Sequence, residues 1–173
     1  MGKKAKSSAN AQVVRSKLHQ DCYEGQRLDE LLQSIQREIK RARLLNAESL
    51  PAKIWLKKQF AVGVNEVTRV LERMTPSGDS ARIMNPNYKA CTVRLQAILL
   101  AGDCNPRWLT NHLPTLALSR NVPLLLMKDK EGSLRLGELV NLKTAIAIGI
   151  KANGSLINQL IGEILQGTVS LKV

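Results

Sequence analysis

Aromatic residues are scarce in this chain of 173 residues, which has two tryptophans, two tyrosines and one phenylalanine. Proteins that hold single-stranded nucleic acid stack successive bases on exposed aromatic rings. Five rings are too few for a wide platform of that kind. We therefore do not expect base stacking to be the main way in which this chain binds a partner.

Residues suited to catalysis or metal binding are also few. The two histidines, His19 and His112, have no recognisable set of catalytic partners. The three cysteines lie far apart without a CxxC pair, and His19 with Cys22 lacks a second pair of ligands. No phosphate-binding glycine loop, HExxH or GxSxG motif occurs. We expect no catalytic residues, no metal and no cofactor, and we interpret His112 as a partly buried structural histidine.

Long hydrophobic runs are missing too. The longest, "AILLAG" and "VPLLLM", are far shorter than the roughly 20 residues that a membrane-spanning helix needs. The start "MGKKAKSSANAQ" does not resemble a signal peptide, and an odd number of cysteines does not suggest a disulfide framework. We therefore expect an intracellular protein.

Positive charge is abundant, because 26 Lys and Arg residues face 14 Asp and Glu residues, for a net charge of +12. The excess is spread over both the first 60 residues and the remainder. Such a balance favours a polyanionic partner, with RNA or DNA ahead of a membrane surface. The plain alternative is a basic protein without such a partner. The hydrophobic fraction of 44% is that of a globular core.

Changes in composition divide the chain into three parts. Residues 1–25 are polar and predict a flexible basic arm. Residues 26–57 predict a helical extension, whose apolar stripe packs on the domain or on a sister protein subunit. Residues 58–173 predict the main domain, with a mobile loop insertion at 75–90 where "TPSGDSARIMNPNY" is rich in turn residues. The stripe consists of Leu28, Leu31, Leu32, Ile35, Ile39, Ala42 and Leu45.

Within the domain, strand and helix patterns alternate. Strands are predicted in "TVRLQAILLAG", "VPLLLM" and "KTAIAIGI", and helices in "NPRWLTNHLPTLALSRN", "SLRLGELVN" and "SLINQLIGEILQG". Asn105 is the expected N-cap of the first helix, which should kink at Pro114, and Ser155 and Gly167 should bound the last. The pattern predicts an α/β fold, a three-layer α-β-α sandwich with a small mixed sheet, plus an N-terminal amphipathic helical extension.

The stretch "VGVNEVTRVLER" begins a further helix with an amide and a carboxylate side by side. A helical wheel places Val67, Val70, Leu71 and Met74 toward the core, and it turns Asn65, Glu66, Arg69 and Arg73 outward. The free N–H groups of the helix start attract phosphate, and Gly63 lets another backbone approach. A carboxylate also accepts hydrogen bonds from the exposed N–H edge of guanine. The alternative is ordinary capping, with Asn65 as N-cap and Glu66 as a first-turn acid.

Three stretches, "GVNEVTRVLER", "LAGDCNPRWLTNHLPTLALSRNVPLLL" and "LGELVNLKTAIAI", follow one another in an order that resembles the L-seven-Ae family of kink-turn RNA-binding proteins. The similarity spans about residues 58–166 and is greatest to the branch that serves ribonuclease P and ribonuclease MRP. It implies an α-β-α sandwich and a non-catalytic role beside a catalytic RNA. The implied partners are a structured RNA with a kink-turn or bulge (ribonuclease P or MRP RNA) and sister protein subunits, in the nucleus and nucleolus.

Two other functions remain open. One is a kink-turn-binding role in a small nucleolar ribonucleoprotein or the ribosome. The other is a protein-interaction module of the same fold that has lost RNA binding.

The resemblance also implies residue roles. Asn65 and Glu66 contact the guanines of two sheared G·A pairs, and Arg69 supports them. The loop at 139–143 closes over a nucleotide flipped out of the bulge, with Asn141 in the left-handed conformation of a missing glycine. Asn105 replaces a frequent acid, and Lys130, like Lys128, either touches phosphate or belongs to a solvated surface. The full RNA-binding set is Gly63, Val64, Asn65, Glu66, Arg69, Arg73, Asn105, Lys130, Val140, Asn141, Leu142 and Lys143.

Overall fold

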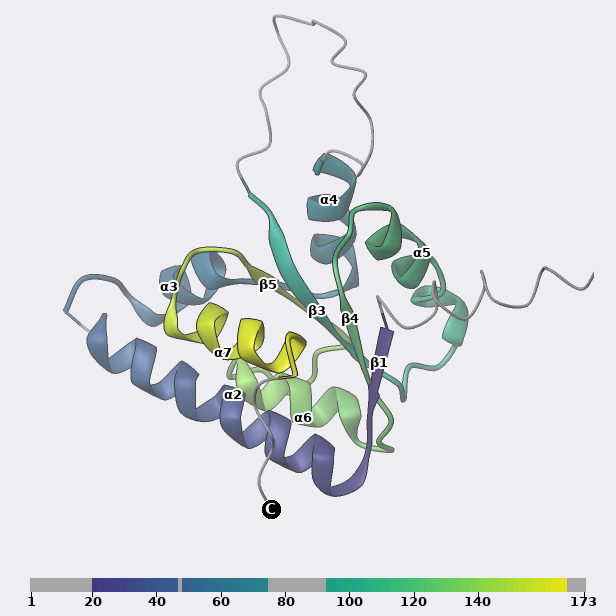
Figure 1. Ribbon diagram of the computed structural model, residues 1–173, viewed down its shortest axis with the longest axis horizontal. Helices are drawn as coiled ribbons and strands as arrows, with labels where there is room; N and C mark the ends of the chain where they lie inside the picture. Colours follow the sequence, from purple (N-terminus) through teal and green to yellow (C-terminus); the bar gives the residue numbers. More distant parts are fainter. Residues whose placement is uncertain (1–19, 47, 75–92, 168–173) are drawn as a thin grey trace, which may run out of the picture.

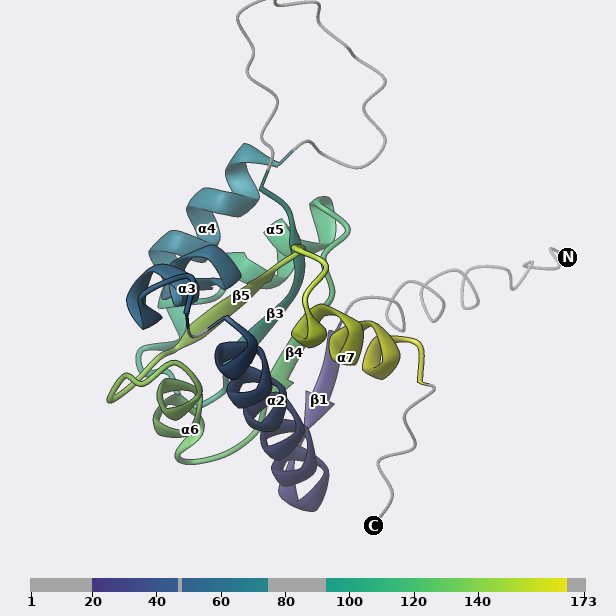
Figure 2. The same ribbon diagram turned by 90° about the vertical axis from the view of Figure 1, so that its left-hand side faces the viewer.

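The computed structural model describes residues 20–46, 48–74 and 93–167. In this part of the chain a five-stranded sheet lies between two layers of helices (Figures 1 and 2). The predicted three-layer sandwich is confirmed. The first 19 residues of the predicted arm and the predicted insertion at 75–90 lie outside the described residues.

The sheet is mixed, as predicted. Its strands are β1 (Gln20–Tyr23), β2 (Phe60–Val62), β3 (Leu95–Ala101), β4 (Leu124–Met127) and β5 (Ala147–Lys151), in the spatial order β1-β4-β3-β5-β2. β4 runs parallel to both β1 and β3, whereas β5 is antiparallel to β3 and β2. One edge of the molecule therefore contains the C-terminal ends of β1, β2, β3 and β4 and the N-terminal end of β5.

Helices cover both faces of this sheet. α2 (Gly25–Leu45), α3 (Ala52–Gln59), α6 (Gly132–Leu139) and α7 (Leu156–Leu165) share one apolar core, and α4 (Val64–Arg73) and α5 (His112–Ser119) share the other. Neighbouring residues of β3 serve opposite cores, since Leu99 faces the first and Ile98 and Leu100 face the second. Trp55 and Phe60 are both buried in the first of these cores.

The predicted arm extends too far along the chain. Residues 20–23 form β1, which pairs with β4, and Tyr23 is buried beneath the cation of Arg27, 4.5 Å from its ring centroid. A four-residue strand carries too little alternation to be recognised in a polar segment. Its pairing partner lies about a hundred residues away in the sequence.

The amphipathic helix is present as α2, and its stripe belongs to the core of the domain. Leu28, Leu31 and Ile35 are fully buried, and α2 packs against α6 and α7. The sequence left open whether the stripe packs on the domain or on a sister protein subunit. In the structure it packs on the domain. Leu45 alone among the predicted stripe residues stays exposed.

The helix predicted after β3 begins later than expected. Asn105 precedes a cis peptide bond to Pro106, a 3-10 turn (η1) follows at Arg107–Leu109, and α5 begins only at His112. Asn105 is therefore not a helix N-cap. Pro114 lies in the first turn of α5, where its missing N–H costs no intrahelical bond, so it does not kink a longer helix.

The last helix follows its predicted signals. Ser155 caps α7 in a capping box with Asn158, and Gly167 has a positive φ of 68° just after its end. No helix in the described ranges is both long and apolar enough to cross a membrane.

Gly137 gives a test of how the fold positions the loop after α6. A Cβ added there would lie 2.7 Å from the Leu142 backbone oxygen and 2.8 Å from the Thr144 Cα. Gly137→Ala should therefore push the loop outward and cost about 1–2 kcal/mol, less than overpacking of a rigid core because the loop is exposed. Thermal unfolding measures the cost. Gly162→Ala, where only Gln96 Nε2 lies within 4 Å at 3.6 Å, should instead stabilise by about 0.5–1 kcal/mol. Equal melting temperatures for the two variants would contradict this.

Candidate nucleic-acid interface

Backbone hydrogen bonds bring the predicted site segments together at one edge of the sheet. Gly63 N donates to Ala147 O at 2.8 Å, which places the start of α4 beside the start of β5. Ala101 N donates to Ile146 O, and Gly102 N to Met127 O, both at 2.8 Å. We call this region, residues 63–69, 102–107, 128–130 and 140–146, the binding edge.

Among the described residues, none accepts from the first backbone N–H groups of α4, and no side chain caps this helix start. Its N-cap is Gly63, whose φ of 96° and ψ of 154° suit glycine alone, and no side chain accepts from the first turn. The first intrahelical bond is from Val67 N to Gly63 O at 3.0 Å, so the amides of Val64, Asn65 and Glu66 precede it. An added Cβ at Gly63 would meet nothing within 4 Å. Another molecule can therefore approach this backbone.

The capping alternative for Asn65 is wrong. Asn65 is the second residue of α4, its side chain is exposed, and it makes no hydrogen bond to another described residue. Its amide therefore points outward with both donor and acceptor free of the helix end. Glu66 does lie in the first turn, where a carboxylate complements the helix dipole.

Glu66 and Arg69 form a loose ion pair on the surface of α4. Arg69 Nη1 lies 3.4 Å from Glu66 Oε2, and the two side chains are 58% and 43% exposed. An exposed pair at this distance contributes little to stability, so either group can turn to a ligand. Arg73 is exposed on the last turn of α4, while Val67, Val70, Leu71 and Met74 are buried, as the helical wheel predicts.

α5 holds α4 in place. Thr68 Oγ1 donates to Val64 O at 2.7 Å, so the 2.8 Å contact with His112 Nε2 requires an N–H on that nitrogen. Arg120 Nε donates to Leu71 O at 2.8 Å. His112 is exposed, which corrects its interpretation as a partly buried residue. It orients α4 from the outside.

A hollow of about 760 Å³ opens beside the ends of β3 and β4 and reaches α5. Its lining includes three cations, Arg107, Lys128 and Lys130, none of which forms an ion pair with a described residue. The two acids in the lining, Asp103 and Asp129, are engaged elsewhere. Space for an anionic group therefore lies among unpaired positive charges.

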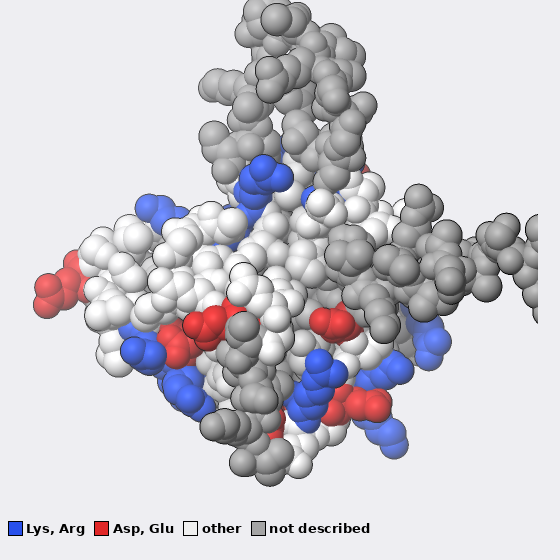
Figure 3. Space-filling view, in the orientation of Figure 1, with Lys and Arg blue, Asp and Glu red and all other residues white. Residues whose placement is uncertain are grey.

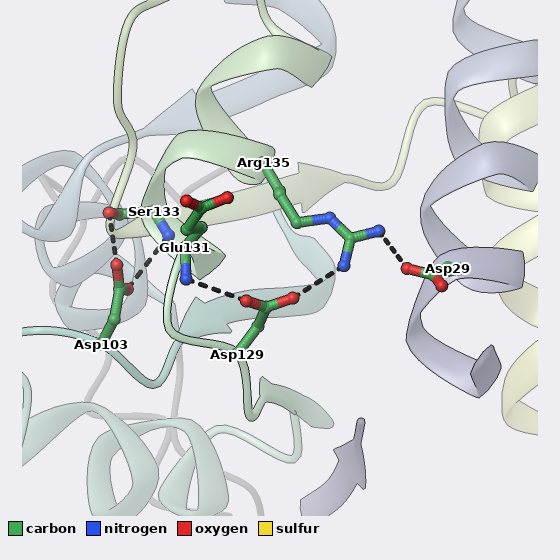
Figure 4. A network of polar contacts seen from close by, with 6 residues as sticks. All are labelled: Asp29, Asp103, Asp129, Glu131, Ser133 and Arg135. Carbon is green, nitrogen blue, oxygen red and sulfur yellow. Dashed lines mark hydrogen bonds and ion pairs between the residues drawn. The ribbon is translucent and has the colours of Figure 1, made fainter. Parts of the chain in front are cut away.

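Figure 4 shows how those acids are used. Asp103 accepts from Ser133 N at 3.0 Å and from Ser133 Oγ at 2.6 Å, and so caps the start of α6 across 30 residues of sequence. Asp129 accepts from Glu131 N and from Arg135 Nη1, each at 2.8 Å. Arg135 also pairs with Asp29 of α2. The segment with Lys128 and Lys130 is thus tied to two helices.

The loop between α6 and β5 completes the binding edge. Asn141 has a φ of 57°, which confirms its predicted left-handed conformation, and Asn141, Leu142 and Lys143 are exposed. Val140 is only 3% exposed, so it can offer a ligand no more than backbone atoms. Leu142 N donates to Gly137 O at 2.8 Å, and Ala145 N to Ser133 O at 2.9 Å, which fixes the loop on α6.

The structure brings most of the predicted residues together, and it adds one. Asn105 is exposed next to Cys104, which lines the hollow, and Lys130 lines the hollow itself. Arg73 lies at the C-terminal end of α4, whereas the binding edge contains the N-terminal end of that helix. Arg107 was missed by sequence reasoning, because the segment "NPRWL" was interpreted as an ordinary helix start. A basic residue directly after Asn-Pro beside a predicted site was the signal available.

The pKa of Asp129 is lowered, chiefly because its carboxylate accepts from the Glu131 backbone N–H and also from Arg135. A carboxyl group with a depressed folded-state pKa stabilises the fold above its unfolded pKa of about 4, and this contribution is lost as pH falls through the folded value. The melting temperature of Asp129→Asn should therefore lie below that of the parent at neutral pH, and the difference should shrink below about pH 4. Glu72→Gln removes an exposed carboxylate with no described partner. The difference between its melting temperature and that of the parent should therefore not shrink below about pH 4. If the melting temperatures of Asp129→Asn and the parent differed by the same amount at every pH, the ionised Asp129 carboxylate would not stabilise the fold.

Residues 89–159 match the model of the ribosomal protein L7Ae/L30e/S12e/Gadd45 family. The chain is similar to that family over this stretch. It is 33% identical to ribonuclease P protein subunit p38 of Homo sapiens over 98 residues, 57% of this chain and 27% of that protein. It is 33% identical to large ribosomal subunit protein eL8 of Caenorhabditis elegans over 88 residues, 51% of this chain and 25% of that protein. The chain thus spans about a quarter of the length of these two relatives.

A solved structure agrees with the fold. The Giardia lamblia 15.5kD RNA binding protein superimposes with a TM-score of 0.51 at 17% identity, covering 83% of this chain and 88% of that one. The family match begins after α4, so the roles of Asn65, Glu66 and Arg69 remain predictions that rest on their geometry.

Proposed function

We propose that this protein binds a kink-turn or a similarly bulged RNA through the binding edge, as a non-catalytic subunit of ribonuclease P or ribonuclease MRP. The observation that carries the proposal is the start of α4. Free backbone amides, an outward amide and an outward carboxylate meet there beside a loop and a cationic hollow.

The presence of Glu66 in the basic binding edge favours recognition of RNA bases over simple attraction to phosphate. Glu66 repels phosphate, but it accepts hydrogen bonds from the N–H edge of guanine, and Arg69 offsets the repulsion. A regular A-form helix hides its base edges in a deep, narrow groove. A kinked or bulged element opens that groove, so a rigid helix start can reach the guanines.

The hollow gives this RNA a second point of attachment. A nucleotide extruded from the bulge would extend from α4 toward the ends of β3 and β4, past the loop at 140–146. Arg107, Lys128 and Lys130 would neutralise phosphate there, and Lys143 and Leu142 would cover the base from the loop. Val140 would take part through its backbone alone.

The likeness to ribonuclease P protein subunit p38 supports the choice of particle. In this role the RNA carries out catalysis, and the protein supplies shape recognition, charge neutralisation and a surface for sister subunits. The proposed processes are 5′ processing of precursor tRNA and processing of rRNA, in the nucleus and nucleolus.

The alternative particles are a small nucleolar ribonucleoprotein and the ribosome, and the likeness to eL8 speaks for the latter. Immunoprecipitation from the source cells, with sequencing of the bound RNA, distinguishes them. We expect ribonuclease P or MRP RNA as the main species. Guide RNAs or ribosomal RNA as the main species would overturn the choice of particle, and failure of the purified protein to retain a kink-turn hairpin on a filter would overturn RNA binding itself.

A further inference from the structure

A groove with apolar walls and basic charge lies between the end of α2 and the start of α3. It has a volume of about 470 Å³, and Trp55 and Leu50 line it together with Leu44, Lys40 and Arg43. We call it the α2–α3 groove. Neither the fold nor the proposed RNA site uses it.

The α2–α3 groove lies far from the part of the binding edge that contains Lys128. α2 begins close to Tyr23, whose carbonyl accepts from Lys128 N at 2.9 Å. Its 21 residues then extend about 31 Å, at 1.5 Å per residue, toward the groove at the other end of the helix (Figure 1). An occupant of the groove would therefore leave the segment with Lys128 free for RNA.

The apolar residues at this end of α2 are unusually exposed. Leu44 and its neighbour Leu45 are 77% and 75% exposed, and Ile54 on α3 is 46% exposed. Elsewhere on α2 the large aliphatic side chains are buried. Exposed aliphatic residues gathered around a groove mark a protein contact, whereas RNA is bound by cations, amides and aromatic rings. The apolar content therefore favours a protein segment.

The charge around the groove selects an acidic segment. Lys40 and Arg43 line it, and none of the acids that the structure describes does. Of the acids nearby in sequence, Glu38 is paired with Arg41 at 3.0 Å, which leaves Glu48 against the two lining cations. In Figure 3, Lys and Arg side chains lie at the lower left with Asp and Glu side chains beside them, below a largely uncharged surface.

Residues 1–19 and 168–173 have the wrong charge to fill the groove. Residues 1–19 contain five Lys and Arg residues and no Asp or Glu, and residues 168–173 contain one Lys and no acid. A second copy of this chain, with its net charge of +12, would also be repelled. The complementary occupant is a different protein.

We infer that the α2–α3 groove docks an amphipathic helix of a partner protein, with leucine-like side chains on one face and Asp or Glu on the other. Its apolar face covers Leu44 and reaches the wall formed by Leu50 and Trp55. Its acids pair with Lys40 and Arg43. Such helix-in-groove contacts use apolar anchors for affinity and rim charges for choice of partner.

A display library tests this inference on the full chain without knowledge of the partner. The library holds amphipathic helical peptides whose apolar face is rich in leucine and whose polar face carries either glutamate or lysine. Scrambled glutamate peptides, which lack the apolar face, are the control for charge alone. We expect selection on the protein to enrich the amphipathic glutamate peptides over both other groups.

Variants then locate the contact. Leu44→Asp should weaken binding of the enriched peptides at least about tenfold, and Lys40→Glu with Arg43→Glu should transfer the preference to lysine peptides. Leu118→Asp on α5, at a site 50% exposed, is the matched control and should bind like the parent. Because Leu44 is exposed, this substitution should not unfold the domain.

Several results would overturn the inference. These are no enrichment above the display background, equal enrichment of scrambled or lysine peptides, and peptide binding that Leu44→Asp leaves unchanged. A dimer that Leu44→Asp dissociates in sedimentation would identify a second copy as the occupant. A tenfold loss of kink-turn hairpin affinity in Leu44→Asp would identify RNA instead, whereas unchanged hairpin affinity agrees with two separate surfaces.

Discussion

Deletion of residues 1–46 should leave a chain that no longer unfolds cooperatively. The deletion removes β1 and α2, and with α2 five large buried aliphatic residues. Each such side chain contributes about 1.5–3 kcal/mol, so together they contribute roughly as much as the 5–15 kcal/mol that a whole domain of this kind possesses. The deletion also exposes the apolar residues of α6 and α7 that pack on α2.

Circular dichroism during heating measures this loss. A chain that begins at residue 20 keeps every described element and is the matched control. On α2 itself, Leu31→Ala should cost about 2–5 kcal/mol because Leu31 is fully buried, while Leu44→Ala, at a site 77% exposed, should cost almost nothing. A shortened chain with a sharp unfolding transition and undiminished RNA binding would show that the N-terminal segment is a separate extension.

Glu66→Ala should weaken binding to a kink-turn hairpin by about 1–3 kcal/mol, the effect of a lost base contact. The same protein should bind a control hairpin, whose sheared G·A pairs are replaced by Watson–Crick pairs, as well as before. If attraction to phosphate were the whole interaction, removal of this carboxylate would tighten binding to both RNAs, because Arg69 would lose its partner at 3.4 Å.

Arg69→Ala is the comparison that separates the two effects. It should weaken binding to both hairpins, and the logarithm of affinity should depend less steeply on salt, by about one unit of slope. Glu66 and Arg69 are partly exposed, so circular dichroism should show both variants folded. A Glu66→Ala protein that binds both RNAs like the parent would leave Glu66 as a first-turn acid that serves the helix alone.

The sequence by itself determined those features that depend on residues near one another in the chain. Spacing of apolar residues located α2, and the wheel of α4 separated Val67 and Leu71 from Asn65 and Glu66 correctly. Ser155 and Gly167 bound α7 through local hydrogen bonds and a local positive φ. These are short-range effects, which a linear pattern records.

Local signals also misled where a distant contact decided the conformation. Asn105 and Pro106 read as a helix start, yet α5 begins at His112, and residues 20–23 became a strand by pairing with β4. Capping by Asn65 was an equally good interpretation of "VNEV" until the backbone placed Gly63 at the N-cap.

Only the tertiary structure decided which residues share a site. The strand order puts the end of β2 beside the start of β5, and the ends of β3 and β4 next to that, so segments from residues 63 to 146 meet at one edge. The tertiary structure also decided that the apolar stripe of α2 is buried in the core while Leu44 is exposed. A helical turn is buried only where another helix or strand covers it. Sheet pairing and helix packing join residues far apart in sequence, and no local pattern specifies these partners.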